Sequence, residues 1–198
     1  MTRIYSPIVV VTVLLLAACA QPTVTQDTFY RLRVAPPLAT LEKPKLSGAL
    51  EVPRFSADGL MAGRPIVFSE AADPLQVSAY HYHFWLEPPG VMLRDEMVGY
   101  LRAAGVAKSV VTPELRVDPD FMLIVKIKRV EQVRGPSPKV VVALEVALNA
   151  RKEERLLLLK TYQVEKAAAD NTVGAAVEAL NGAVAAICAG IASDIPAP

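Results

Sequence analysis

The sequence predicts an α+β fold in which two helices pack on one face of a mostly antiparallel sheet, giving two layers. Three observations support this prediction. Many short segments alternate apolar and polar residues between turn residues, which is typical of strands. Two other segments repeat apolar residues every three or four positions, which is typical of helices. The 198 residues, 53% hydrophobic and 21% charged, suffice for one ordinary domain with its own core, which we expect over 29–198.

The first half of the chain is rich in predicted strands. Residues 34–45 contain several prolines and form an expected loop. Pro53 indicates the end of a strand or an edge position, because proline cannot donate to a strand ladder. The strands that we expect in this half cover 29–34, 46–55, 66–69 and 75–87.

Residues 88–105 form the first predicted helix. Pro88 or Pro89 suits its first turn, where a missing N–H is tolerated, and Gly105 is a natural stop. Apolar residues recur at helical spacing between these ends. A short strand over 106–111 is expected directly after the helix.

Three longer strands are predicted next, over 120–133, 139–150 and 155–167. The short turns between them predict antiparallel hairpins. We expect a strand as long as 120–133 to offer a sheet edge to a partner. Alternation in that strand places Leu123, Val125 and Ile127 on one side and Ile124, Lys126 and Lys128 on the other.

Residues 170–195 form a second, longer predicted helix, with Asn171 or Thr172 as its N-cap. Its length approaches that of a membrane span. Glu178 and Asn181 interrupt the apolar run, however, and therefore favour a core helix. Its apolar stripe consists of Val173, Val177, Leu180, Val184, Ile187 and Ile191.

The N-terminus has the features of an export signal. Arg3 precedes a nine-residue apolar run, Ile8–Leu16, broken only by Thr12. A membrane span needs about 20 residues, whereas a run of this length is typical of a signal peptide. The alternative to the lipid-attachment motif described next is an ordinary secretory signal cut near Ala18 or Ala20.

The sequence Leu16-Ala17-Ala18-Cys19 resembles the bacterial lipobox. This resemblance implies that residues 1–18 are removed and that Cys19 carries two or three acyl chains, with 19–28 as an acylated tether. One acyl chain anchors a protein only marginally, whereas several hold it stably. Ala20 in place of Asp implies sorting to the outer membrane, facing the periplasm.

Charge and motifs exclude several function classes. The 21 basic and 20 acidic residues nearly cancel, so no nucleic-acid partner is expected. The sequence has no Gly-x-x-x-x-Gly-Lys-Ser/Thr loop, no Gly-x-Ser-x-Gly elbow and no His-Glu-x-x-His motif. We therefore expect no catalytic residue and no cofactor. Cys188 lies in an apolar helix and is expected to be a buried, inert thiol.

The segment Ser78–Gly90 contains both histidines and the only tryptophan of the chain. Alternation would place His81, His83 and Trp85 on one face and the intervening aromatic residues on the other. Two imidazoles could begin a metal site, but zinc needs three or four protein ligands and no third histidine exists. We therefore expect no metal, and a strand that is buried or covered by a partner.

The run Val52–Gly105 resembles the ABC-type transport auxiliary lipoprotein family, which has the PqiC lipoproteins as relatives. The matching pattern is Phe55–Leu60, then Ile66-Val67, then a Tyr-x-x-x-x-Trp-x-x-Pro-Pro segment that opens a helix. Tyr30–Leu32 matches the opening strand of the family. The residues of the Tyr-to-Pro segment are Tyr80, Trp85, Pro88 and Pro89, and Phe84 departs from the polar or basic residue expected there.

This resemblance implies a periplasmic lipoprotein subunit of an MCE-type transport system, together with an ATPase, a permease and an MCE-domain protein. Such systems are thought to move phospholipids or other hydrophobic molecules between membranes, and the lipoprotein would act as a tether or structural partner. Self-association is a further expectation. The alternative is a stand-alone periplasmic lipid carrier with an apolar cavity. The expected partner-contact or structural corner consists of His81, His83, Trp85, Pro88 and Pro89.

Overall fold

The computed structural model describes residues 25–196. The predicted signal peptide and Cys19 lie outside these residues. The strands are β1 (Thr28–Tyr30), β2 (Leu46–Glu51), β3 (Ser56–Ala57), β4 (Pro65–Glu70), β5 (Asp73–Trp85), β6 (Ala107–Val111), β7 (Phe121–Arg134), β8 (Lys139–Ala150) and β9 (Arg155–Ala167). The helices are α2 (Pro89–Ala104) and α3 (Val173–Asp194), with short 3-10 turns η2 (Gly59–Ala62) and η3 (Pro113–Leu115). The predicted α+β class is confirmed.

Within residues 25–196, all nine strands join one mixed sheet. Five of its eight pairings are parallel, so the prediction of a mostly antiparallel sheet is wrong. The predicted meander β7–β8–β9 is antiparallel, as is the β4–β5 hairpin. The parallel pairs join segments far apart in the chain, such as Thr28 with His83 and Leu50 with Phe121. Alternation within a strand shows which faces are apolar but not which distant strand lies beside it.

Strand β7 is the centre of the sheet. One edge pairs with β8 along its length, and the other edge pairs in turn with β2, β3 and β4. Both edges of β7 are therefore occupied, and the expectation that this strand offers an edge to a partner is wrong. In the described part of the chain, β9 pairs only with β8, so β9 provides an open edge instead.

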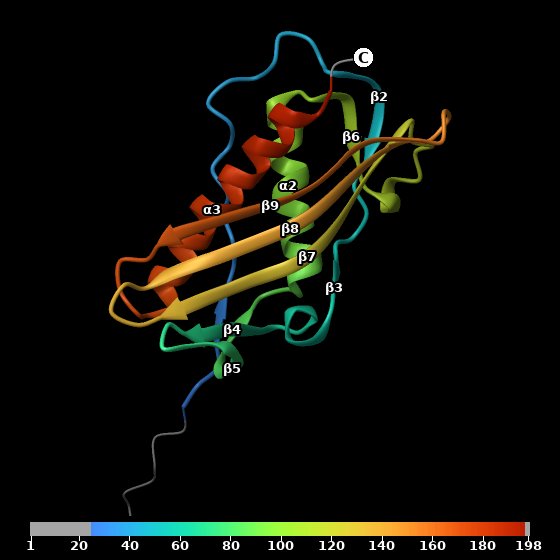
Figure 1. Cartoon of the computed structure of the whole chain (residues 1–198). Helices are drawn as coiled ribbons and strands as arrows, with labels where there is room; N and C mark the ends of the chain where they lie inside the picture. The colour runs from blue at the N-terminus through green and yellow to red at the C-terminus, as the bar shows by residue number, and fades with distance from the viewer. Residues whose placement is uncertain (1–24, 197–198) are drawn as a thin grey trace, which may run out of the picture.

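Both helices lie on the same side of the β7–β9 strands (Figure 1). Helix α2 begins with Pro89 and ends at Gly105, which has the left-handed φ of 68° that favours glycine. In helix α3, the Thr172 hydroxyl accepts a hydrogen bond from the Ala175 N–H at 3.2 Å and caps the first turn. The start and end of α2 and the N-cap of α3 agree with the sequence prediction.

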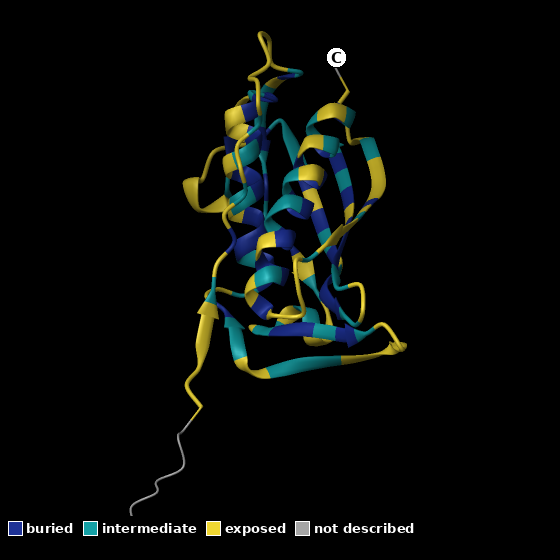
Figure 2. Ribbon diagram, turned by 90° about the vertical axis from the view of Figure 1, so that its left-hand side faces the viewer, coloured by how far each residue is buried: buried dark blue, intermediate teal, exposed yellow. Residues whose placement is uncertain are grey.

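The space between the helices and the sheet is filled with apolar side chains. The predicted stripe of α3 is buried throughout, and Leu123, Val125 and Ile127 of β7 are buried in the same core, on one side of their strand as predicted. Helix α3 is long and apolar enough to span a membrane, with a mean hydropathy of 1.7, but it packs on β8 and β9 with that stripe inward. Figure 2 shows the helices and the sheet from the side, with buried positions between them.

Candidate functional site

The histidine-containing segment is irregular rather than strictly alternating. Ala79 pairs with Val67 and Phe84 pairs with Pro65, so four residues of β5, Tyr80–His83, lie opposite the single residue Ile66. Bulges of this kind redirect side chains. Simple alternation therefore fails for the faces of this segment. His81 is exposed, His83 is half-buried and Trp85 is buried.

His83 lies in a cluster of aromatic rings on the helix side of the sheet. The Tyr30 hydroxyl lies 3.1 Å from Nδ1 of His83, and the ring of Tyr80 meets that of His83 edge-on at 5.2 Å. This hydrogen bond gives the imidazole a partner inside the protein. The centroid of the His81 ring lies 6.5 Å from that of the neighbouring Tyr82 ring, whereas His83 lies against Tyr30 and Tyr80. No group of three or more His, Cys, Asp or Glu residues that could hold a metal occurs within residues 25–196.

Trp85, Pro88 and Pro89 form a strand-to-helix corner. The Trp85 side chain is only 1% exposed, and its backbone is held at both groups: its N–H donates to the Arg64 carbonyl at 2.7 Å, and its carbonyl accepts from Arg64 Nε at 3.1 Å. Pro88 is the N-cap of α2 and Pro89 its first residue. The structure brings these three residues together, away from the exposed His81.

Gly90 also belongs to this corner. It was not identified as a corner residue from the sequence. Its carbonyl accepts from the Phe55 N–H at 3.0 Å, and a Cβ added to it would lie 2.3 Å from the Phe55 carbonyl oxygen. Only glycine allows this approach. The signal was present, because Gly90 directly follows the two prolines at a helix start.

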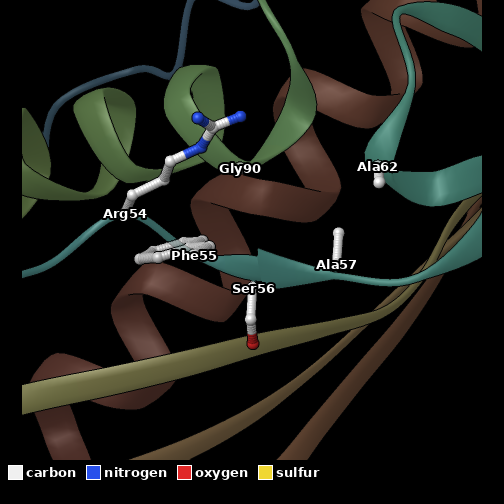
Figure 3. Close-up of a pocket in the computed structure, with 6 residues that line it drawn as sticks. All are labelled: Arg54, Phe55, Ser56, Ala57, Ala62 and Gly90. Atoms are coloured by element: carbon white, nitrogen blue, oxygen red, sulfur yellow. The ribbon is translucent and has the colours of Figure 1, made fainter.

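The hollow beside this corner is open to solvent. It has a volume of about 340 Å3 and is shown in Figure 3. Its lining consists of Arg54, Phe55, Ser56, Ala57, Ala62 and Gly90. A larger hollow, of about 440 Å3, lies where the starts of β2, β7 and β9 meet Pro196, and it also opens to solvent. Neither is an enclosed apolar chamber of the kind that holds an acyl chain.

A buried polar network ties the β4–β5 hairpin to β7 and α3. Gln132 is 0% exposed, accepts from the Tyr80 hydroxyl at 2.9 Å and donates to the Asn171 carbonyl at 2.9 Å. The Arg134 guanidinium lies 4.1 Å above the Phe68 ring and pairs with Glu70. These contacts give the polar groups partners inside the fold. The network therefore indicates a structural role.

The thiol of Cys188 is buried and is expected to be unreactive. Cys188 is 0% exposed, and burial raises its pKa to about 12. The thiolate is the reactive form, so this cysteine is inert at neutral pH. The predicted burial of this thiol is confirmed.

The face of β7–β9 turned away from the helices carries an unexpected apolar surface. In register, Ile124 lies beside Ala147, which lies beside Leu159, and Met122 lies beside Asn149, which lies beside Leu156. Ile124 is 46% exposed and Leu159 64%. We call Met122, Ile124, Ala147, Leu156 and Leu159 the outer apolar row.

Polar residues border the outer apolar row. Lys126 and Glu145 pair in register one step along the strands, and Lys126 also forms an ion pair with Asp58 at 2.7 Å. An apolar centre with a polar rim is the usual composition of a protein interface. The sequence held an ambiguous signal, because four consecutive leucines from Leu156 to Leu159 conceal which of them point outward.

Comparison with known proteins places most of the described chain in one family. A family model described as "ABC-type transport auxiliary lipoprotein component" matches residues 30–192. No curated protein sequence matches this chain.

Solved structures show the same fold. A crystal structure of a Xanthomonas campestris protein of the DUF330 family has 21% identity and a TM-score of 0.72, covering 84% of this chain and 93% of its own. A second, described as an uncharacterized protein, has 18% identity and a TM-score of 0.68, covering 86% of this chain and 99% of its own. A hypothetical protein from Chlamydia trachomatis has 8% identity and a TM-score of 0.51, covering 77% of this chain and 99% of its own.

Proposed function

Because this chain belongs to the ABC-type transport auxiliary lipoprotein component family, we propose that it is a lipid-anchored accessory subunit of an MCE-type ABC transport system. In this proposal it acts as a tether or structural partner and not as a catalyst. The system would move phospholipids or other hydrophobic molecules between membranes. The resemblance of the pattern of Tyr80, Trp85, Pro88 and Pro89 to that of the PqiC-like lipoproteins supports this proposal.

The observation that carries this proposal is the outer apolar row on the helix-free face. Its exposed leucines and isoleucine are not needed to close the core, which is filled by the opposite face of the same strands. Large exposed apolar patches with polar rims mark sites of interaction. A subunit whose task is to hold partners requires such a surface, whereas a catalyst requires converging polar groups.

The proposed anchor is Cys19, acylated at the outer membrane on its periplasmic side. Confinement to a membrane raises the effective concentration of the domain for a partner held nearby. Weak contacts through the outer apolar row then suffice for stable assembly.

A stand-alone lipid carrier is the second candidate. Such a carrier must enclose acyl chains, because burial of apolar surface drives their binding. The hollows beside Gly90 and beside Pro196 are open, which favours the accessory subunit. Mass spectrometry of lipids retained by the purified full chain separates the two: the accessory subunit should retain none in stoichiometric amount beyond its covalent acyl chains.

The test of the proposed function is co-purification from the native host. The full chain with a C-terminal affinity tag is solubilised in mild detergent, and the retained proteins are identified. We expect a transport ATPase, a permease and an MCE-domain protein, and a mature N-terminus at an acylated Cys19. A correctly acylated chain that retains none of these partners contradicts the proposal.

A further inference from the structure

The described chain begins at one end of the molecule. Strand β1 pairs with the last residues of β5, Thr28 with His83 and Tyr30 with Trp85. The β4–β5 hairpin lies at this same end, as do residues 25–30, the first that the structure describes (Figures 1 and 2). The loop containing Leu41 lies at the opposite end of α2, where its N–H donates to the Ala104 carbonyl. The two ends of the molecule are thus separated by the 16-residue helix α2, about 24 Å long.

At the end where the described chain begins, the register of β1, β4 and β5 places aromatic and apolar side chains on the face of the sheet turned away from the helices. Phe29 lies beside Phe84, and their rings are 5.8 Å apart. Val77 lies beside Ser69 on the same face, which the even spacing from Pro65 to Ser69 establishes. Phe29 is 51% exposed and Val77 40% exposed.

Two irregularities of β5 add further exposed apolar groups. The register moves from the pair Glu70–Asp73 to the pair Ser69–Val77, which leaves Pro74–Gln76 without partners in β4, and Leu75 is 93% exposed. The bulge Tyr80–His83 leaves Tyr82 47% exposed. Leu86, in the corner before α2, is 44% exposed. We call Phe29, Leu75, Val77, Tyr82 and Leu86 the tether-end patch.

The tether-end patch cannot lie far from the proposed anchor. Cys19 precedes Thr28 by nine residues, which span at most about 30 Å when fully extended. We infer that this end of the domain rests on the phospholipid surface, with the tether-end patch in the headgroup region. The inference rests on the proposed acylation of Cys19. It adds that the domain has a fixed orientation, which a long free tether would not give.

The chemistry of the patch fits a lipid surface. Tyrosine and phenylalanine with an adjacent cation suit the boundary between acyl chains and headgroups. The Arg64 guanidinium lies 5.2 Å above the Phe29 ring, where it can meet a lipid phosphate. Acidic residues are also present at this end, so the contact is chiefly apolar and should respond weakly to salt. The exposed charged residues there are Asp27, Arg31, Arg64, Asp73 and Glu87.

The test uses the full acylated chain in vesicles of phosphatidylethanolamine and phosphatidylglycerol. Single cysteines replace Leu75 or Tyr82 and carry an environment-sensitive fluorophore. Cys188 is fully buried and Cys19 is blocked by its acyl groups, so labelling is specific. Leu38→Cys is the matched control, because Leu38 is fully exposed and belongs to the loop at the opposite end of α2. A quencher attached to lipid headgroups reports contact.

We expect quenching at Leu75→Cys and Tyr82→Cys to be several-fold greater than at Leu38→Cys and to persist at high salt. Equal quenching at all three positions in chains that float with the vesicles overturns the inference while leaving the anchor intact. Shielding of positions 75 and 82 without headgroup quenching also overturns it, and indicates a second copy or a protein partner there. Chains that do not float contradict the proposed anchor and this inference together.

Discussion

The two faces of strands β7–β9 are built from the same alternating sequence but have different tasks. The helix-covered face is closed: Leu123, Leu144 and Leu148 are 0% exposed in the core beneath the helices. The opposite face carries Ile124 and Leu159 with roughly half or more of each side chain in solvent. Burial on the first face stabilises the fold, whereas exposure on the second leaves apolar area that only another molecule can cover. Mutations on the two faces should therefore separate stability from binding.

The comparison is tested most strongly by shortening one leucine on each face. Leu144→Ala removes a fully buried side chain and should lower the free energy of unfolding by about 2–5 kcal/mol. Leu159→Ala, on the outer face, should change it by no more than about 0.5 kcal/mol. Urea denaturation followed by circular dichroism measures both. Equal losses would show that the outer face also carries the stability of the fold.

Two glycines of α2 extend the comparison to the corner. Gly90→Ala places a Cβ 2.3 Å from the Phe55 carbonyl oxygen and should cost about 1–3 kcal/mol. Gly99→Ala meets no atom within 4 Å on the exposed side of the same helix, and should stabilise the protein by about 0.5–1 kcal/mol. Thermal unfolding should therefore shift in opposite directions. A destabilising Gly99→Ala would mean that the outer side of α2 is more constrained than its contacts indicate.

The buried polar network should produce the next effect. Gln132→Ala removes the partner of the Tyr80 hydroxyl and of the Asn171 carbonyl, and should cost about 1–3 kcal/mol. Tyr80→Phe removes one of these hydrogen bonds and should cost less. Hydrogen exchange of the β4–β5 hairpin amides should speed up in both variants. Unchanged exchange would show that the hairpin is held by packing alone.

The smallest effect concerns an exposed carboxylate. Hydrogen bonds with Thr112, with backbone N–H and with Arg94 lower the pKa of Glu114 from 4.5 to about 2. A lowered pKa contributes stability above the ordinary pKa, and this contribution is lost as the pH falls from about 4.5 towards 2. Glu114→Gln should therefore reduce the drop in melting temperature between pH 5 and pH 3, by a degree or so. An identical drop in both proteins would contradict the assigned pKa.

The sequence predicted what depends on local pattern. The cap at Thr172, the stop at Gly105 and the inward face of β7 all follow from residues within a few positions of each other. The parallel pairings did not follow, because β2 and β7 meet only through long-range packing. The four residues Tyr80–His83 likewise lie opposite the single residue Ile66 of β4, and no local signal fixes where such a bulge forms.

The candidate surfaces were only partly foreseen. Trp85, Pro88 and Pro89 form the corner, whereas the bulge leaves His81 exposed and apart from it. The outer apolar row was hidden, because a run of four leucines satisfies either face of a strand. Exposure depends on which face the helices cover, and that choice depends on α3, more than ten residues further along the chain.

The most direct test of the proposed function is quantitative co-purification of the full acylated chain carrying Leu159→Glu. The account predicts that the MCE-domain protein, the permease and the ATPase fall about tenfold or more relative to wild type, while unfolding and membrane anchoring are unchanged. Leu38→Glu, at a leucine that is even more exposed and remote from the outer apolar row, should retain them. Full retention of the three partners by the Leu159→Glu chain would contradict the account.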